Sequence, residues 1–345
     1  MAKRTLKWLG ITLVVLPVVV LTIVGIGSSL SLDRDYNHTN ETAALPLFSG
    51  EFASSSVASS SPSSAPALVR IQANGFEFRA RIAGSGGDAP TVILLHGFPV
   101  TSAMWEPMIM PLVDAGYRVI APDQRGYSPG ARPEEAGAYA IGELVSDVVA
   151  IADAVGAETF HLIGHDWGSA VGWSTVLSHP DRVLSWTGLS IAHPTAFFYA
   201  LENDPDQQSR SGYFALFTMP WVPEALFTFN NLVVLKAFYS AMGPLEQEEY
   251  QAVFAEPRAL TSALNWYREM DGGFGRDPQM VNETNTPTLF IWGNRDEAVG
   301  RSAIQSQKRY MTGPYREIEL DADHWLMSTH ADEITSAVLE HLNAN

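Results

Sequence analysis

The fold is encoded most clearly in Leu162-Ile163-Gly164-His165-Asp166-Trp167-Gly168. This stretch ends a short apolar run and begins an apolar, helix-compatible segment, Ser169 to Leu177. A strand that enters a helix through Gly-x-x-x-Gly makes a sharp turn, and the turn exposes the middle side chain above the sheet. The sequence therefore predicts a nucleophile elbow with Asp166 at its apex. The structural alternative is an aspartate that only caps the helix.

A carboxylate at the apex restricts the chemistry of the site. Attack on an ester or amide would give a mixed anhydride, which is a poor intermediate for hydrolysis. Attack on a saturated carbon gives an ordinary alkyl ester, which water can then open. If Asp166 is the nucleophile, the substrate is therefore a carbon that bears a leaving oxygen or halogen.

Further motifs accompany the elbow. They are His96-Gly97-Phe98-Pro99 after the apolar run Val92 to Leu95, Ala121-Pro122-Asp123-Gln124-Arg125-Gly126-Tyr127, Leu264-Asn265-Trp266-Tyr267-Arg268 and the turn around His324-Trp325. Together they resemble the α/β-hydrolase superfamily and, within it, the epoxide hydrolases, over about residues 68 to 343. Variants of the His-Gly-Phe-Pro turn, of the segment Ala121 to Tyr127 and of the elbow also occur in dehalogenases of the same fold. The Asn-Trp-Tyr-Arg motif is more specific to epoxide hydrolases.

The resemblance implies the order nucleophile, acid and histidine along the chain. Asp296 follows the apolar run Thr288 to Trp292, and His324 follows the alternating run Tyr315 to Leu320. Both residues thus lie at the C-terminal ends of predicted strands, where open α/β sheets bind their ligands. We expect His324 to activate water and Asp296 to orient the imidazole, with Glu297 as the rival for the second role.

The resemblance also assigns the groups around the reacting bond. Backbone N–H groups of Phe98 and Trp167 are expected to form the oxyanion hole, and the Phe98–Pro99 peptide bond is expected to be cis. Two tyrosines are expected to protonate the leaving oxygen, Tyr267 in the Asn-Trp-Tyr-Arg motif and, by a looser match, Tyr213. This pair favours an epoxide, because a departing halide needs no proton.

The whole chain predicts an α/β fold: an α/β-hydrolase core with a mostly parallel central sheet and a helical cap insertion. Short apolar runs, typical of strands covered on both faces, alternate with helical periodicity such as Ile141 to Val155. The predicted strands are a hairpin over 68–82, then 91–95, 118–121, 161–163, 183–189, 288–292 and the edge-side strand 315–320, before a closing helix over 331–342. The core is predicted over residues 67–192 and 287–345, and the aromatic-rich cap over 193–286.

The N-terminal region has a different composition. Lys3, Arg4 and Lys7 precede an uncharged stretch, so residues 1–32 are predicted to be an uncleaved signal-anchor or, alternatively, a removed signal peptide. Basic residues before this stretch and acidic residues after it put the catalytic domain outside the cytoplasm, either membrane-anchored or secreted. Residues 33–66 are predicted to be a Ser/Ala/Pro-rich linker.

Composition excludes several classes of function. The formal net charge of −17 argues against binding nucleic acid. The absence of cysteine rules out a disulfide, a thiol nucleophile and a cysteine-based zinc site, and we expect neither a cofactor nor a metal. The sequence therefore predicts an epoxide hydrolase that uses a small apolar epoxide and water. The alternatives are a haloalkane or haloacid dehalogenase and a non-catalytic hydrolase-fold binding protein, while the natural substrate and the oligomeric state stay open.

Overall fold

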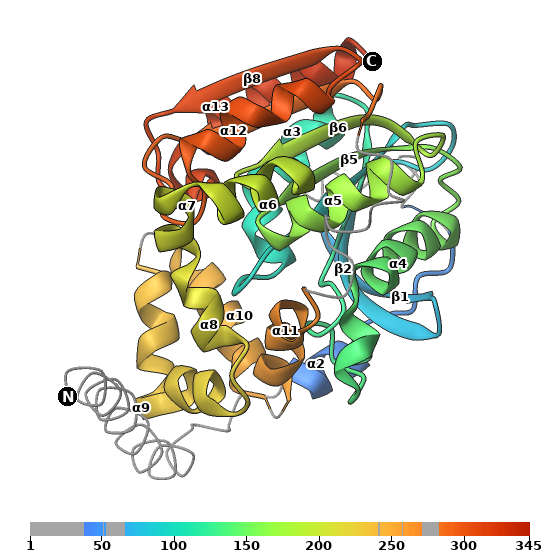
Figure 1. The fold of residues 1–345 in the computed structure, drawn as a ribbon. Coiled ribbons are helices and arrows are strands. Elements are labelled where there is room, and N and C mark those ends of the chain that lie inside the picture. Colours follow the sequence, from blue (N-terminus) through green and yellow to red (C-terminus); the bar gives the residue numbers. More distant parts are fainter. Residues whose placement is uncertain (1–37, 51, 53–65, 241, 257, 271–282) are drawn as a thin grey trace, which may run out of the picture.

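The computed structural model describes residues 38–50, 52, 66–240, 242–256, 258–270 and 283–345. These residues form an eight-stranded sheet with helices packed on both faces and a group of further helices at one side (Figure 1). The predicted signal-anchor, residues 1–32, lies outside the described residues. Among the helices that the structure describes, none has the length and apolar character needed to cross a bilayer.

The sheet has the strand order β1-β2-β4-β3-β5-β6-β7-β8. The pairs β1–β2 and β2–β4 are antiparallel, and the other neighbouring pairs are parallel. The strands are β1 (Ala67–Ala73), β2 (Phe76–Ala83), β3 (Thr91–Leu95), β4 (Arg118–Pro122), β5 (Phe160–His165), β6 (Val183–Leu189), β7 (Thr288–Gly293) and β8 (Tyr315–Leu320). The predicted strands, the hairpin and the edge position of β8 are thereby confirmed.

Helices cover both faces of the sheet. α4 (Ile141–Ala154) and α5 (Trp167–Ser178) pack on one face, and α3 (Glu106–Asp114) and α13 (Leu326–Asn343) pack on the other (Figure 1). Because both faces are covered, β3, β5 and β7 are buried along their whole lengths, which explains their continuous apolar runs. The closing helix α13 begins at Leu326 rather than at residue 331 and is kinked at His330.

The described residues between β6 and β7 fold mainly into helices. They are α6 (Pro194–Asn203), α7 (Pro205–Arg210), α8 (Phe214–Phe217), α9 (Val222–Phe238), α10 (Pro244–Phe254) and α11 (Ala259–Arg268). A 3-10 turn, Ser211–Tyr213, precedes α8, and α9 is interrupted at 229–232. Further 3-10 turns occur outside this region, at Ser102–Trp105, Ala136–Tyr139 and Lys308–Tyr310. α6 packs against α12 (Arg301–Gln307) of the core, whereas α8 to α11 pack on one another and form the cap.

Part of the region predicted as a linker, residues 33–66, packs on the core. α2 (His38–Ala44) buries His38, Leu47 forms a parallel bridge with Arg70 of β1, and Phe52 is buried. The composition argument rested on the Ser-rich stretch 54–66, whereas the residues before it carry leucine and phenylalanine side chains that can be buried. The linker prediction therefore does not hold for residues 38–50.

Candidate active site

Asp166 lies at the end of β5, in the turn predicted from the Gly-x-x-x-Gly frame. Its φ is 53°, a left-handed conformation that residues other than glycine rarely adopt. A Cβ atom on Gly164 would overlap the backbone of Gly168, and one on Gly168 would overlap the backbone of Leu95. Although Asp166 precedes α5, its side chain makes no capping hydrogen bond. The structure thus favours the elbow over the helix cap, with Asp166 lining a cavity.

The turn after β3 holds the Asp166 carboxylate. The Phe98 N–H donates to Asp166 Oδ1 at 2.8 Å, and the Phe98–Pro99 bond is cis, as expected. Gly97 approaches so closely that a Cβ atom there would overlap the same carboxylate. Trp167, the other predicted oxyanion donor, is the first residue of α5, and its role stays a prediction.

His324 lies between two carboxylates. Its Nδ1 is 3.1 and 3.0 Å from the two carboxylate oxygens of Asp296, and its Nε2 is 3.5 Å from Asp166 Oδ2. Since a carboxylate only accepts, Nδ1 carries the hydrogen that bonds to Asp296. Glu297 instead accepts the backbone N–H of His324 at 3.4 Å, so the geometry favours Asp296 over Glu297 as the partner of the imidazole.

The electrostatics of these three groups are coupled. Burial by itself would lower the pKa of His324, but the charges of Asp296 and Asp166 and their hydrogen bonds raise it well above its usual value. Burial likewise opposes ionisation of Asp166, yet its hydrogen bond and charge interaction with His324 hold its pKa below the usual range. Burial also opposes ionisation of Asp296, but the charge and hydrogen bond of His324 lower the pKa of Asp296 below its usual value. The free site therefore holds two carboxylates and one imidazolium.

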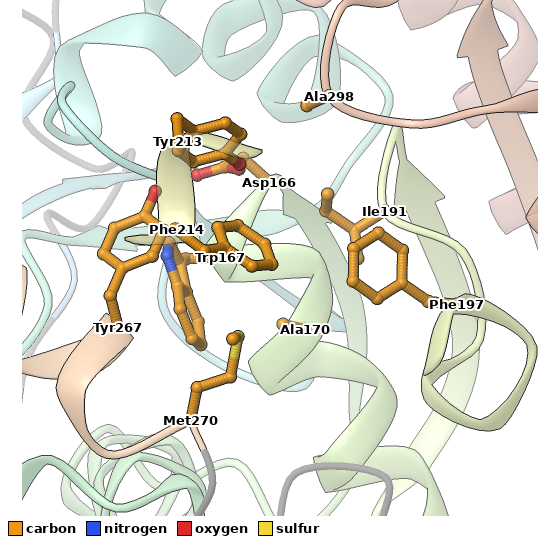
Figure 2. Close-up of a pocket in the computed structure, with 10 residues that line it drawn as sticks. All are labelled: Asp166, Trp167, Ala170, Ile191, Phe197, Tyr213, Phe214, Tyr267, Met270 and Ala298. Carbon is orange, nitrogen blue, oxygen red and sulfur yellow. The ribbon is translucent and has the colours of Figure 1, made fainter. Parts of the chain in front are cut away.

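The two predicted tyrosines both lie beside Asp166. Tyr213 ends the 3-10 turn before α8, and Tyr267 lies on α11. Their ring centroids are 6.1 Å apart, and Figure 2 shows both side chains around the Asp166 carboxylate. Burial raises the pKa of each hydroxyl well above its usual value, as does the nearby charge of Asp166. Both tyrosines therefore remain protonated donors at neutral pH.

Tyr267 is positioned by its neighbours in the Asn-Trp-Tyr-Arg motif. The indole N–H of Trp266 donates to the Arg125 carbonyl at 3.0 Å, which attaches α11 to the core. Arg268 donates to Asn265 Oδ1 at 3.0 Å and to Glu224 of α9 at 2.8 Å. The motif thus encodes the docking of α11 as well as the tyrosine itself.

Two cavities meet at Asp166. The larger has a volume of about 680 Å³, within the usual range for ligand pockets, and its lining includes His324 and both tyrosines. The smaller, shown in Figure 2, has a volume of about 30 Å³. Its walls are Trp167, Ala170, Ile191, Phe197, Phe214, Met270 and Ala298 together with Asp166 and the two tyrosines.

Three residues at the site were not predicted. His165 Nε2 donates to the backbone carbonyl of His324 at 2.9 Å, Arg210 donates to the backbone carbonyl of Asp296, and Ala298 lines both cavities. His165 lies next to Asp166 in the elbow motif, so its position in the sequence could have indicated a site role. No local pattern identifies the other two, because their contacts depend on how distant segments pack.

Comparison with other proteins agrees with this geometry. The chain matches the family described as alpha/beta hydrolase fold over residues 90–331. It is 33% identical over 320 residues to Epoxide hydrolase A of Mycobacterium tuberculosis, covering 81% of this chain and 98% of the relative. It is also 33% identical over 279 residues to AB hydrolase superfamily protein YfhM of Bacillus subtilis, covering 79% and 96%.

A solved structure is similar over the same part of the chain. The crystal structure of Epoxide Hydrolase A from Mycobacterium thermoresistibile superposes with a TM-score of 0.68 at 31% identity, covering 81% of this chain and 98% of that one. Fold, site geometry and sequence similarity thus point the same way. The chain belongs to the α/β-hydrolase superfamily and is an epoxide hydrolase-like enzyme.

Proposed function

We propose that the protein hydrolyses epoxides to vicinal diols through a covalent alkyl ester on Asp166. The observation that carries this proposal is the pair Tyr213 and Tyr267 beside Asp166 in one cavity. Opening an epoxide requires a nucleophile for carbon and a proton for the departing alkoxide, and this cavity offers both. The similarity to proteins named epoxide hydrolases supports the same activity.

In the first step, Asp166 Oδ2 attacks one ring carbon and forms a new C–O bond. The ring C–O bond breaks, and the oxygen keeps the electron pair and takes a proton from Tyr213 or Tyr267. Oδ1 becomes the carbonyl oxygen of the ester. Because Oδ1 already accepts the Phe98 N–H, one donor for the later oxyanion is in place before it is needed.

The ester changes the charge around His324. Asp166 is neutral once alkylated, so the pKa of His324 loses one of the two charges that raise it. The imidazolium then gives up its proton, which neutralises the tyrosinate, and the neutral imidazole can act as a base. Asp296 still accepts from Nδ1 and keeps Nε2 free to accept a proton.

In the second step, His324 takes a proton from water, and the hydroxide attacks the ester carbonyl carbon. The acyl C–O bond breaks and the diol leaves as an alkoxide that takes the remaining carboxyl proton. Asp166 is left as a carboxylate and His324 as an imidazolium, which is the starting state of the site. The overall reaction consumes one epoxide and one water.

The tyrosine pair gives the decisive test. Tyr213→Phe and Tyr267→Phe should each slow ester formation by about 10-fold or more, the usual scale for losing a general acid, and the double variant should be far slower. Tyr199→Phe, at an exposed tyrosine of α6, is the matched control and should react at the wild-type rate. The measurement is rapid-quench detection of the alkyl enzyme. An unchanged rate in the double variant, with halide release from a haloalkane, would favour a dehalogenase instead.

We also propose that residues 1–32 anchor the enzyme to a membrane, with the catalytic domain outside the cytoplasm. The support is the sequence alone: three basic residues precede an uncharged, largely apolar stretch that runs from Trp8 to Leu32. A removed signal peptide, which would leave a secreted enzyme, is the alternative outcome of the test described in the Discussion.

A further inference from the structure

The reacting groups lie at a junction. Asp166, Tyr213, Tyr267 and Ala298 line both the large and the small cavity. An epoxide held between the carboxylate and the tyrosine hydroxyls has its two ring carbons at this junction. The substituent on one ring carbon then extends into the large cavity, and the substituent on the other extends into the small one.

The two cavities differ in volume by more than an order of magnitude, at about 680 and about 30 Å³. A space of roughly 10–15 Å³ on this measure holds one water-sized group. The volume of the small cavity therefore corresponds to a substituent of one or two carbons. The large cavity has room for a long chain or a ring system, and its lining includes aromatic and aliphatic side chains of the cap such as Leu216, Phe217, Leu226, Phe227 and Phe238.

The far wall of the small cavity is fixed by the core. Ile191 and Phe197 are buried, with 9% and 3% of their surfaces exposed, and Figure 2 shows them side by side across the pocket from Tyr267. The backbone carbonyl of Ile191 accepts both Ser169 Oγ at 2.9 Å and the indole N–H of Trp173 at 3.1 Å. Moving these side chains to enlarge the cavity is energetically unfavourable, because a closely packed core does not readily accommodate added volume.

We propose that the substrate is an epoxide with a large apolar arm on one ring carbon and at most two carbons on the other, and that Ile191 and Phe197 set this limit. The inference rests on the proposed epoxide hydrolysis at Asp166. It identifies the substrate class as terminal or near-terminal epoxides and excludes those with two long arms.

Positional isomers of epoxydecane test the limit at constant size and hydrophobicity. The short arm is hydrogen, methyl, ethyl and butyl in 1,2-, 2,3-, 3,4- and 5,6-epoxydecane, and cis and trans forms are assayed separately. Each methylene beyond a fitted pocket lowers kcat/KM by about 10-fold or more. We therefore expect the first three isomers to be hydrolysed and 5,6-epoxydecane to have a kcat/KM at least about 100-fold lower.

Variants of the wall locate the limit. Ile191→Ala and Phe197→Leu should each raise kcat/KM for 5,6-epoxydecane by about 10-fold or more, while the rate with 1,2-epoxydecane shows that each variant is folded. Two wall variants are used so that, if one of them misfolds, the other still tests whether the wall sets the size limit. Leu184→Ala, at an exposed position of β6 that lines neither cavity, is the control and should leave the preference among isomers unchanged.

The outcomes separate the two proposals. Hydrolysis of all four isomers with similar kcat/KM would overturn the size limit while leaving the epoxide hydrolase proposal intact. Selectivity that persists in both folded wall variants would overturn the assignment to Ile191 and Phe197. Failure to hydrolyse any isomer, or any other epoxide of a broad panel, would instead overturn the proposed function itself.

Discussion

A single imidazole stabilises two buried carboxylates at this site. His324 is within 3.5 Å of both Asp166 and Asp296, and its charge offsets the cost of burying them. In the proposed mechanism, alkylation of Asp166 removes one negative charge and leaves Asp296 as the sole anionic partner of the ring. At the scale of single residues, the proposed ester intermediate would therefore convert His324 from an ion-pair partner into a base.

Replacing His324 with Gln should separate the two half-reactions. Asp166 keeps its Phe98 donor and can still be alkylated, whereas hydrolysis of the ester should slow by about 100-fold or more, because its general base is lost. Intact-mass analysis should show the enzyme gaining the mass of one substrate molecule. Asp166→Asn is the control and should gain nothing, while an inactive His324→Gln enzyme without added mass would contradict the assigned step.

The wild-type enzyme should show different pH dependences for the two half-reactions. Ester formation needs ionised Asp166, whose pKa lies below the usual range, so its rate should be flat from mildly acidic to neutral pH. Ester hydrolysis needs neutral His324. Its rate should therefore rise with pH until the pH passes the pKa of His324 in the ester intermediate, which we expect to be lower than in the free enzyme. Rapid-quench measurements at several pH values resolve the two steps, and a hydrolysis rate that falls as pH rises would contradict the base assignment.

At the scale of elements, the cap is attached to the core by a buried charge network. Arg79 and Arg81 on β2 both bind Glu249 on α10, and Arg79 also binds Asp123 after β4 at 2.7 Å. Thr101, in the loop that follows Phe98, donates to the same glutamate at 2.6 Å. One cap helix is thus joined to β2 and to the loop that follows Phe98.

Glu249→Gln tests the importance of this network for stability. Burial opposes the charge of Glu249, but Arg81 and Arg79 lower its pKa to about 2, so the native state depends on the anion. Neutralising it leaves two buried guanidinium groups short of a partner, which should reduce the free energy of unfolding by about 3–5 kcal/mol. Glu248→Gln, at the exposed neighbouring position on α10, should change it by less than about 0.5 kcal/mol in the same urea titration. Equal losses in the two variants would contradict the network's role.

At the scale of the whole molecule, buried neutral histidines should make the fold sensitive to acid. Burial lowers the pKa of His161 and His165 to about 4 and that of His193 to about 3. Each residue binds a proton more readily in the unfolded chain, where its pKa is about 6.5. Stability should therefore fall as pH drops from 6.5 towards 4, by about 1.4 kcal/mol per pH unit for each fully neutral histidine.

His193→Phe isolates one of these contributions. The ring of His193 stacks on Tyr310 at 4.6 Å, and within the described structure its nitrogens have no hydrogen-bond partner, so a phenyl ring can replace it. Relative to its stability at pH 7, the variant should lose about 2 kcal/mol less than the wild type on going to pH 5. His179→Phe, at a partly exposed histidine, is the control. If the free energy of unfolding had the same pH dependence in the wild type and in His193→Phe, the explanation would be wrong.

Truncation at the N-terminus tests both the proposed anchor, residues 1–32, and the packing of α2 and Phe52 on the core. A chain that begins at Asp33 should leave the membrane fraction without detergent, whereas the full chain should need detergent for release. A chain that begins at Ala65 should also be released but be less stable by at least about 2 kcal/mol, because it loses the burial of Phe52 and the bonds from Thr39 to Glu256. Equal stability of the two shortened chains would contradict the docking of α2, and N-terminal sequencing of the full protein distinguishes an anchor from a cleaved signal.

The sequence alone determined the features that depend on local pattern. Continuous apolar runs identified the strands because a strand covered on both faces needs apolar side chains at every position. The elbow was predictable because Gly164 and Gly168 allow a backbone approach that no larger residue permits. The placement of Asp296 and His324 followed from strand ends, since parallel strands finish at the same edge of the sheet.

The tertiary structure decided what depends on contacts between distant segments. Asp296 and Glu297 are adjacent in sequence, and only the position of the imidazole distinguishes them. The docking of α2 and the unequal cavities on either side of Asp166 likewise arise from side chains brought together from the core and the cap. Local periodicity reports which face of an element is buried, but the volume left between elements depends on how all of them pack. The position of Asp166 at the elbow could therefore be predicted from the sequence, whereas the volumes of the two cavities beside it could not.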